Sequence, residues 1–424
     1  MQFSSLLSAY ERENPDIEIV YEIIPDASVS GYKAEDRENA IARLRTALMS
    51  GSGPDLYLLR TNYLISSNPD TLTDNLLTDI EGAMQNGVFC DLLPLFESVG
   101  MYVDDYIAPV METGRQNGKQ YIAPIRYDVQ GVLTNNTTRE IMGAAAFESA
   151  DGMMDGLLAI SEIQGAGSRT ALNFVTGSNY LEYFCNPYFL SNPPIVDYGA
   201  RIASIDTPMA RKILSAGKTA QENIGDLVTL ASANSSMTLE EWKNYAQSEK
   251  YFVVCGDLRA LANEAAISEH IGVTPNLDAF PDQDGGVSAI ITLYTGIRSN
   301  SANKLNAVNL IKMLLSEQYQ TIPGNVDWTN GWPVRKEALA GRLAEYVAPG
   351  EIIHSMYFMN ETYAVPLSDK TVDSFLAIEA RVTDARFPPP LEAAAIINQY
   401  LSGEIDIDAT VENTQAYWDM SLKE

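Results

Sequence analysis

Segments with the two-residue period of β-strands alternate along this chain with segments that have the 3.6-residue period of helices. Residues 16–24 alternate isoleucine and tyrosine with glutamate and predict a strand. Residues 34–50 place Ile41, Leu44 and Leu48 on one stripe and predict a helix. Residues 55–59 follow the break at Gly53-Pro54 and predict a second strand. Such a unit is typical of open α/β sheets, in which ligands bind beyond the carboxyl ends of the strands.

The same alternation continues to the end of the chain. Thr207-Pro208 is a cap and first turn for a helix that runs to residue 224, and Thr238 with Glu241 forms a capping box before another helix. Further helices are predicted at residues 3–14, 302–317 and 391–401, and further strands at residues 251–255 and 288–297. In the helix at residues 302–317, the side chains expected to face inward are Leu305, Val308, Ile311 and Leu315.

Length and charge limit what the chain can bind. Its 424 residues exceed what one hydrophobic core usually serves, so we expect two or three domains. There are 56 acidic and 28 basic residues, a net charge of −28. Nucleic-acid backbones are bound by clustered lysine and arginine, so we expect no nucleic-acid partner, and the same charge disfavours an anionic membrane surface. No apolar run reaches the roughly 20 residues that span a bilayer.

The residues needed for most catalytic and metal sites are scarce. The chain has two histidines, His270 and His354, and three distant cysteines, Cys90, Cys185 and Cys255, which we expect to be buried apolar residues. It has no Gly-x-Ser-x-Gly elbow, phosphate-binding loop or dinucleotide fingerprint. We therefore expect no enzyme, no metal and no cofactor. Paired carboxylates remain open as a glycosidase site, although we expect Asp282 and Asp284 on a solvated turn.

Four stretches, read in order, resemble the extracellular solute-binding proteins of bacterial ABC importers, family 1, the sugar-binding and maltose-binding-protein-like branch. The first is residues 10–19, a helix that ends at Asn14-Pro15 before a strand, and the second is residues 47–57, a small-residue turn followed by Pro-Asp. The third is residues 117–124, Asn-Gly-Lys-Gln-Tyr-Ile-Ala-Pro, with Asn135 downstream. The fourth joins Gly296-Ile297, Ala307, residues 331–334 and Ala338-Leu339. Together they span nearly the whole chain.

The resemblance implies a type II periplasmic-binding-protein-like fold of class α/β, with two lobes that are each a mixed sheet flanked by helices and are joined by hinge strands. It places lobe one at residues 1–133 and 286–332, and lobe two at residues 134–285 and 333–424, the last part being helical. In that family a strand precedes the first helix, which leaves open whether the native chain has an additional N-terminal strand.

The resemblance also implies a function. The chain would be the extracellular substrate-binding component of an ABC transporter, which closes around a sugar or oligosaccharide by hinge motion and delivers it to membrane permease subunits. We expect a monomer, tethered to the outer face of the cytoplasmic membrane as a lipoprotein whose signal segment is absent from this chain. Neither the sugar nor the permease follows from the sequence.

Sugar sites combine aromatic platforms with acids, amides and guanidinium groups. The richest such mixture lies at residues 325–333, where Trp328 and Trp332 are stacking candidates, and Tyr127-Asp128 follows Pro124 at a strand end. Several of these candidates have a structural alternative. Trp328 and Trp332 would pack in the core or between the lobes, Tyr127 and Asp128 would lie on a surface turn, Tyr294 would be a core residue, and Asp55 would cap a backbone turn. The full set of predicted ligand-binding residues is Trp328, Trp332, Asn330, Tyr127, Asp128, Asp55, Arg60, Tyr63, Asn179, Tyr180, Tyr183 and Tyr294.

Two alternatives remain at this point. The first is a binding protein for a non-sugar ligand such as a polyamine, a peptide or a metal chelate, and the acidic composition suits a cation. The second is an extracellular glycosidase, which needs two carboxylates roughly 5 to 10 Å apart across a cleft.

Overall fold

The fold was taken from a computed structural model, which describes most of the chain. The described residues are 3–24, 33–61, 76–77, 80–163, 195–197, 200–224, 253–256, 258–270, 272–321, 331–346, 352–354, 361–363, 366–387 and 394–423.

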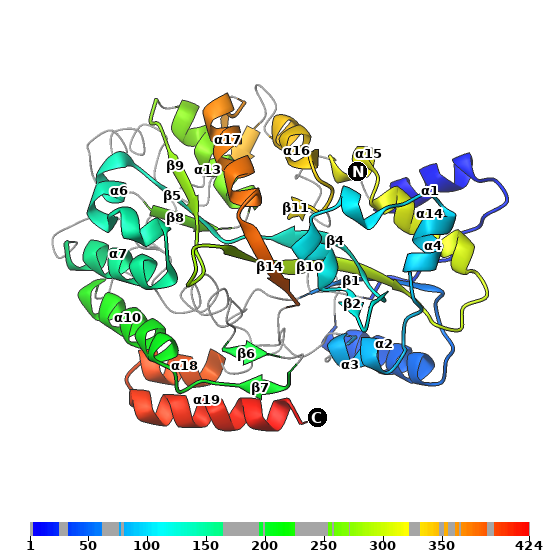
Figure 1. The fold of residues 1–424 in the computed structure, drawn as a ribbon, viewed down its shortest axis with the longest axis horizontal. Helices are drawn as coiled ribbons and strands as arrows, with labels where there is room; N and C mark the ends of the chain where they lie inside the picture. The colour runs from blue at the N-terminus through cyan, green and yellow to red at the C-terminus, as the bar shows by residue number, and fades with distance from the viewer. Residues whose placement is uncertain are drawn as a thin grey trace.

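A five-stranded sheet with β10 at its centre lies in the middle of the molecule (Figure 1). Its order is β1-β10-β4-β11, and β14 pairs with β10 beside β1. β1 and β4 run antiparallel to β10, whereas β14 runs parallel to it. The bounds are β1 Leu56–Arg60, β4 Ala123–Asp128, β10 Val287–Ile297, β11 Trp332–Pro333 and β14 Val382–Arg386. We call this sheet and the helices packed on it lobe one.

A second sheet, of order β8-β5-β9, lies beside the first (Figure 1). Its strands are β5 Gly131–Thr134, β8 Val253–Gly256 and β9 Asn276–Ala279. Only residues 129 and 130 separate β4 from β5, and residues 280–286 separate β9 from β10. The chain therefore crosses twice between the sheets through short connections. We call the second sheet, with the helices on its side of the molecule, lobe two.

Helices surround both sheets. On the side of lobe one are α1 Phe3–Glu13, α2 Ala34–Met49, α3 Ile80–Gln85, α4 Leu93–Ser98, η2 Val103–Asp105, α5 Ala108–Glu112, α14 Lys304–Leu314, α15 Glu317–Gln320 and α16 Ala338–Tyr346. On the side of lobe two are α6 Asn136–Met142, η3 Ala144–Phe147, α7 Ala150–Ile163, α10 Pro208–Ile224, α13 Leu258–His270, α18 Ala394–Leu401 and α19 Ile407–Ser421, and α17 Asp369–Glu379 lies over the junction. Short hairpins pair β2 Arg115–Gln116 with β3 Lys119–Gln120, β6 Val196–Asp197 with β7 Ile202–Ala203, and β12 Ile352–His354 with β13 Glu361–Tyr363.

Two hydrophobic clusters form the core. The smaller one lies within lobe two and includes Trp418 and Met153, both fully buried. The larger one fills lobe one and continues without a break to Leu133 and Leu261 of lobe two. The junction between the sheets is therefore packed with apolar side chains. The residue boundaries expected for the lobes stay a prediction.

Several sequence predictions are confirmed at the level of elements. The helix at 34–50 and the strands at 55–59 and 288–297 correspond to α2, β1 and β10. The helix predicted at 302–317 is shorter, and Leu305 is 58% exposed instead of inward, because the buried face of α14 begins only at Ala307. The capping box at Thr238 lies outside the described residues.

The strand predicted at residues 16–24 is wrong. This stretch has no strand partner among the described residues, and Val20, Tyr21 and Ile23 are 90%, 48% and 66% exposed. Its contacts include a hydrogen bond from the Ile19 amide to Glu11 at 2.7 Å, the ion pair of Glu22 with Arg43, and packing of Ile24 against the core. A two-residue alternation becomes a strand only where a second strand supplies the hydrogen bonds, and no strand among the described residues does so here.

Candidate ligand-binding site

The carboxyl ends of three strands meet at one point of the central sheet. Arg60, the last residue of β1, pairs with Leu293 of β10. Asp128, the last residue of β4, pairs with Ile290 from the opposite side, and Arg386, the last residue of β14, also pairs with Ile290. Residues 290–293 of β10 therefore mark a convergence of strand ends, the position at which open α/β sheets bind ligands. We call this place the strand-end junction.

The residues that follow two of these strands stay in contact with β10. The Thr61 amide donates a hydrogen bond to the Thr292 carbonyl at 3.0 Å, and the Thr61 hydroxyl donates to the Ile291 carbonyl. Phe387, directly after β14, packs edge to face on Tyr294 with the ring centroids 5.1 Å apart. β1 and β14 thus lie end to end along one edge of β10, and the chain leaves both strands at the strand-end junction.

A glycine brings a fourth segment to the same place. Gly331 precedes β11 and has φ of 105°, a conformation that side chains other than glycine rarely adopt. A Cβ atom there would lie 2.6 Å from the Tyr127 carbonyl oxygen and 3.1 Å from the Thr292 hydroxyl. The absence of a side chain lets the backbone pass directly over β4 and β10.

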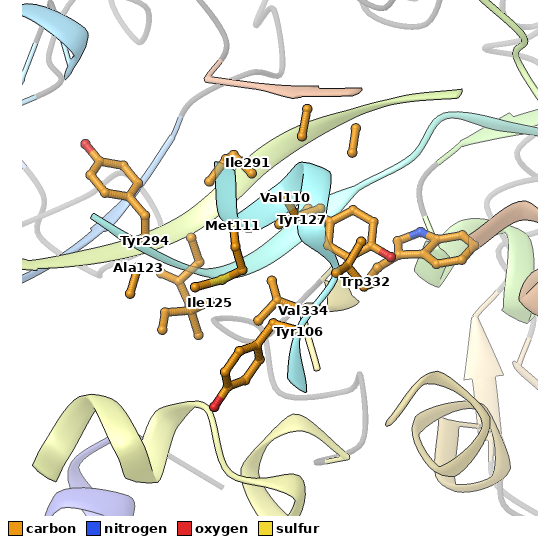
Figure 2. Close-up of a cluster of buried hydrophobic side chains, with 14 of the residues drawn as sticks. Tyr106, Val110, Met111, Ala123, Ile125, Tyr127, Ile291, Tyr294, Trp332 and Val334 are labelled. Carbon is orange, nitrogen blue, oxygen red and sulfur yellow. The ribbon is translucent and has the colours of Figure 1, made fainter. Parts of the chain in front are cut away.

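A stack of buried aromatic rings supports the strand-end junction. Tyr127 and Trp332 are fully buried, and their ring centroids are 6.1 Å apart (Figure 2). Trp332 in turn contacts Phe375 of α17 at 5.9 Å. The Trp332 indole N–H is buried and has no hydrogen-bond partner among the described residues. In this conformation neither Tyr127 nor Trp332 offers a ring face to solvent.

Two buried arginines lie near this stack. Arg126 and Arg342 are both fully buried, and the Arg126 guanidinium donates to the Tyr319 carbonyl at 3.0 Å. Burial, together with the nearby positive charge of Arg342, lowers the pKa of Arg126 to about 9. These guanidinium groups are inside the protein and not on its ligand-facing surface.

The polar groups of the strand-end junction have unequal access to solvent. The Tyr127 hydroxyl donates to Glu379 at 3.5 Å, and burial raises the pKa of the Glu379 carboxyl to about 7 although this hydrogen bond acts in the opposite direction. The Asp128 carboxylate is buried and accepts a hydrogen bond from the Val129 amide at 2.9 Å. Arg60 is exposed, and the side chain of Arg386, paired with Asp384 at 2.9 Å, is 26% exposed. The two arginines are therefore the groups best placed to meet a ligand.

Asp55 lies away from this junction, at the amino end of β1. Its carboxylate accepts hydrogen bonds from Ser301 at 2.6 Å and Asn303 at 2.9 Å, and it pairs with Arg298 at 3.3 Å. These interactions, led by the hydrogen bond from Ser301, lower the pKa of the Asp55 carboxyl. Asp55 ties the turn before β1 to the turn before α14, so we leave it out of the proposed ligand contacts.

The structure thus brings together five of the predicted residues: Arg60, Tyr127, Asp128, Tyr294 and Trp332. Tyr294 is buried, which raises the pKa of its hydroxyl. The other predicted residues, Tyr63, Asn179, Tyr180, Tyr183, Trp328 and Asn330, lie outside the described residues. Sequence reasoning missed Thr292, Glu379 and Arg386. Only Arg386 carried a signal, because it precedes the break at Pro388-Pro389-Pro390.

Comparison with proteins of known structure identifies the fold of this chain. No protein-family model matches the chain, and no curated protein sequence matches it. Structural similarity is extensive, with 554 matching chains of known structure. An ABC substrate-binding protein from Listeria monocytogenes in complex with cycloalternan aligns over 99% of this chain and 95% of its own, with a TM-score of 0.57 and 12% identity. The chain has the fold of the ABC substrate-binding proteins.

Two further proteins with this substrate-binding fold show the same extent of similarity. The cyclic α-maltosyl-1,6-maltose binding protein from Arthrobacter globiformis aligns over 99% of this chain and 95% of its own, with a TM-score of 0.56 and 14% identity. An extracellular solute-binding protein of family 1 from Alicyclobacillus acidocaldarius covers 98% of this chain and 93% of its own, with a TM-score of 0.55 and 13% identity. The α/β, periplasmic-binding-protein-like fold class is therefore confirmed.

In the part of the chain that the structure describes, no helix combines the length and apolarity needed to cross a bilayer. Among the same residues, no three His, Cys, Asp or Glu side chains are grouped so that they could hold a metal ion.

Proposed function

We propose that this protein is the extracellular substrate-binding component of an ABC importer, which binds a sugar or oligosaccharide between its two lobes and delivers it to membrane permease subunits. In this proposal it acts as a monomer, carries out no reaction on its ligand and binds no nucleic acid.

One observation carries the proposal. The carboxyl ends of β1, β4 and β14 converge on residues 290–293 of β10, next to the short connection from β4 to β5. A ligand at the strand-end junction would touch lobe one and the connections to lobe two at the same time. It would therefore interact differently with open and closed arrangements of the lobes, which is the requirement for a ligand to shift the equilibrium between them.

The chemistry of the junction suits hydroxyl-rich ligands. Arginine presents several N–H donors in a planar fork, and these can form paired hydrogen bonds with neighbouring sugar hydroxyls. Arg60 and Arg386 end two strands that meet there, and between them the buried Thr292 hydroxyl has no hydrogen-bond partner among the described residues. One of the structural neighbours is named as a binding protein for cyclic α-maltosyl-1,6-maltose, and another is in complex with cycloalternan. Both names support a saccharide as the ligand class.

A thermal-shift screen tests the ligand class. The screen should include these two cyclic saccharides, linear maltooligosaccharides and chitin oligosaccharides, with spermidine, an oligopeptide and a metal chelate as the non-sugar arm. A ligand present at a hundred times its Kd stabilises the native state by about 2.7 kcal/mol. For lobes of roughly 200 residues this corresponds to a rise in Tm of about 5 to 10 °C. Stabilisation by the non-sugar arm alone would reject the carbohydrate assignment.

Arg60→Ala tests the position of the site. Loss of a charged hydrogen-bond donor at the ligand should weaken binding by roughly 10- to 150-fold, equivalent to about 1.5–3 kcal/mol. The free energy of unfolding should stay unchanged, because Arg60 is exposed. Arg43→Ala is the matched control, since Arg43 is an exposed arginine on α2 whose partner is Glu22. Equal affinity of the Arg60 and Arg43 variants in isothermal titration calorimetry would place the site elsewhere.

The absence of a reaction is tested with the same ligands. Incubation of each stabilising saccharide with the protein should release no reducing ends, whereas a glycosidase would release them in proportion to time and protein concentration.

A further inference from the structure

The chain has three asparagines that are each followed by a glycine. Such an asparagine is open to deamidation, because glycine has no side chain to shield the backbone nitrogen that attacks the asparagine amide. The three pairs are Asn86-Gly87, Asn117-Gly118 and Asn330-Gly331. Asn330 lies outside the described residues. All four residues of the other two pairs are exposed, so access to solvent does not distinguish these pairs.

The first pair is held by hydrogen bonds at the end of helix α3. Gly87 has φ of 67°, and its amide donates to the Met84 carbonyl at 3.1 Å. The Val88 amide donates to the Ala83 carbonyl at 3.1 Å, which completes a Schellman motif. Val88 also packs against the core of lobe one. The Gly87 nitrogen is therefore freed only when the end of the helix opens and Val88 moves with it.

The second pair forms the two-residue turn of the β2–β3 hairpin, in which Gln116 pairs with Lys119. Asn117 has φ of 52° and Gly118 has φ of 77°, and two positive values identify a type I′ turn. In the part of the chain that the structure describes, neither the Gly118 amide nor the Asn117 side chain has a hydrogen-bond partner. A Cβ atom on Gly118 would meet no atom within 4 Å. The attacking nitrogen is therefore unbonded and unobstructed.

The hairpin turn also has a route to the reactive geometry. The peptide unit between Asn117 and Gly118 must rotate so that its nitrogen approaches the carbonyl carbon of the asparagine side chain. Types I′ and II′ are both common in two-residue hairpins, and they differ by a flip of this one peptide unit. The rotation can therefore take place while the flanking pair of Gln116 and Lys119 stays formed. At Gly87 the same rotation would break the hydrogen bond to Met84.

We propose that Asn117 is a site of spontaneous deamidation in the folded protein, whereas the fold protects Asn86. The Gly118 nitrogen gives its proton to hydroxide and forms a bond to the side-chain carbonyl carbon of Asn117. The bond from that carbon to the side-chain nitrogen breaks, and the nitrogen takes a proton from water and leaves as ammonia. Water then opens the five-membered imide at either of its two carbonyls, which gives aspartate or isoaspartate.

The effect of the modification should be confined to the hairpin. Each product adds a negative charge to the turn, and isoaspartate also lengthens its backbone by one carbon. Gln120, which follows the hairpin pair, is buried, and its backbone amide donates to Asp91 at 3.2 Å. Its side-chain amide donates to the carbonyls of Met111 at 2.9 Å and Ile122 at 2.6 Å. The strand-end junction lies at the other end of β4, at Asp128, so ligand binding should be unchanged.

Peptide mapping of the full chain after incubation at mildly alkaline pH tests the proposal. Digestion after glutamate at acidic pH, where deamidation is slow, yields residues 82–97 and 113–140, with one Asn-Gly pair each. Mass spectrometry of the fragments then gives the rate at each asparagine. Release of the two hydrogen bonds at Gly87 and Val88 should slow Asn86, so Asn117 should react about 5- to 150-fold faster, equivalent to about 1–3 kcal/mol.

The two peptides, incubated after digestion, are the matched control. They lack the fold, so the two asparagines should react at similar rates. Asn117→Asp marks the elution position of the aspartate product, and isoaspartate should appear as a separate peak. The proposal would be overturned by equal rates at Asn86 and Asn117 in the folded chain, by a faster rate at Asn86, or by an unreactive Asn117. Since no ligand is added, none of these outcomes bears on the proposed function.

Discussion

Replacement of Trp332 distinguishes a core role from a ligand-stacking role. Its side chain is fully buried between Tyr127 and Phe375. Truncation of a buried tryptophan to alanine removes its transfer free energy and leaves a cavity, which together cost about 3–5 kcal/mol. Folded proteins are stable by only about 5–15 kcal/mol, so Trp332→Ala should lower stability by a large fraction.

The indole N–H makes a further, more specific prediction. Because this donor is buried without a partner, the folded protein bears the desolvation cost of about 1–3 kcal/mol without a compensating hydrogen bond. Trp332→Phe removes that cost while it loses part of the packed volume. We expect the two effects nearly to cancel, so that the phenylalanine variant lies within about 1 kcal/mol of the wild type.

Urea unfolding followed by circular dichroism measures these differences. Trp418→Ala is the control of equal size, because Trp418 is fully buried in the separate cluster of lobe two. Each alanine variant should lower the urea concentration at the midpoint of unfolding of the lobe that contains the substituted residue. If Trp332→Ala instead left the free energy of unfolding within about 0.5 kcal/mol of the wild type and abolished sugar binding, the residue would be a ligand platform and the structural argument would be refuted.

Two further predictions concern the ends of β1 and β11. Asp55→Asn should lower the free energy of unfolding by about 1 kcal/mol at neutral pH. The expected loss is this small because the Asp55 side chain is 37% exposed and solvent screens its charge. Folding lowers the pKa of the Asp55 carboxyl. The stabilisation by the Asp55 carboxylate is therefore fully present above the pKa of aspartate in the unfolded chain, and it is lost as the pH falls through the lower pKa of the folded protein. In urea titrations the free energies of unfolding of the wild type and the variant should therefore converge as the pH is lowered below the ordinary pKa of an aspartate, and a gap that does not narrow would contradict this. Gly331→Ala should cost about 1–3 kcal/mol more than Gly403→Ala, because both have positive φ but only Gly331 also lacks room for a Cβ. Equal losses of stability in the two variants would show that the close approach to Tyr127 is unimportant.

The helices and central strands follow from sequence periodicity because their partners are present. Ile41 and Leu44 on one stripe gave α2, and the apolar run at 288–297 gave β10, which has neighbours on both sides. The same reasoning failed at residues 16–24, where the alternation is clear but none of the described strands pairs with it. A period of two shows which face a strand would bury, and it does not show whether a partner exists.

The site was predictable only in part, for a topological reason. Arg60 and the pair Tyr127-Asp128 were predicted to lie together because each ends a strand that is visible in the sequence, and the strand pairing brings them to the same part of β10. Asp55 lies apart from that group, since it directly precedes the strand that Arg60 ends and its carboxylate binds Ser301. Glu379 and Arg386 come from a segment about 90 residues after β10, and their position depends on the parallel pairing of β14, which no local pattern reveals.

Small-angle X-ray scattering with and without an oligosaccharide that raises the Tm tests the central claim most directly. Closure of two lobes around a ligand at the strand-end junction predicts a smaller radius of gyration in the bound state, with Arg60→Ala needing at least about tenfold more ligand for the same change. An unchanged radius of gyration at saturating ligand would show that binding does not bring the lobes together and would contradict the account.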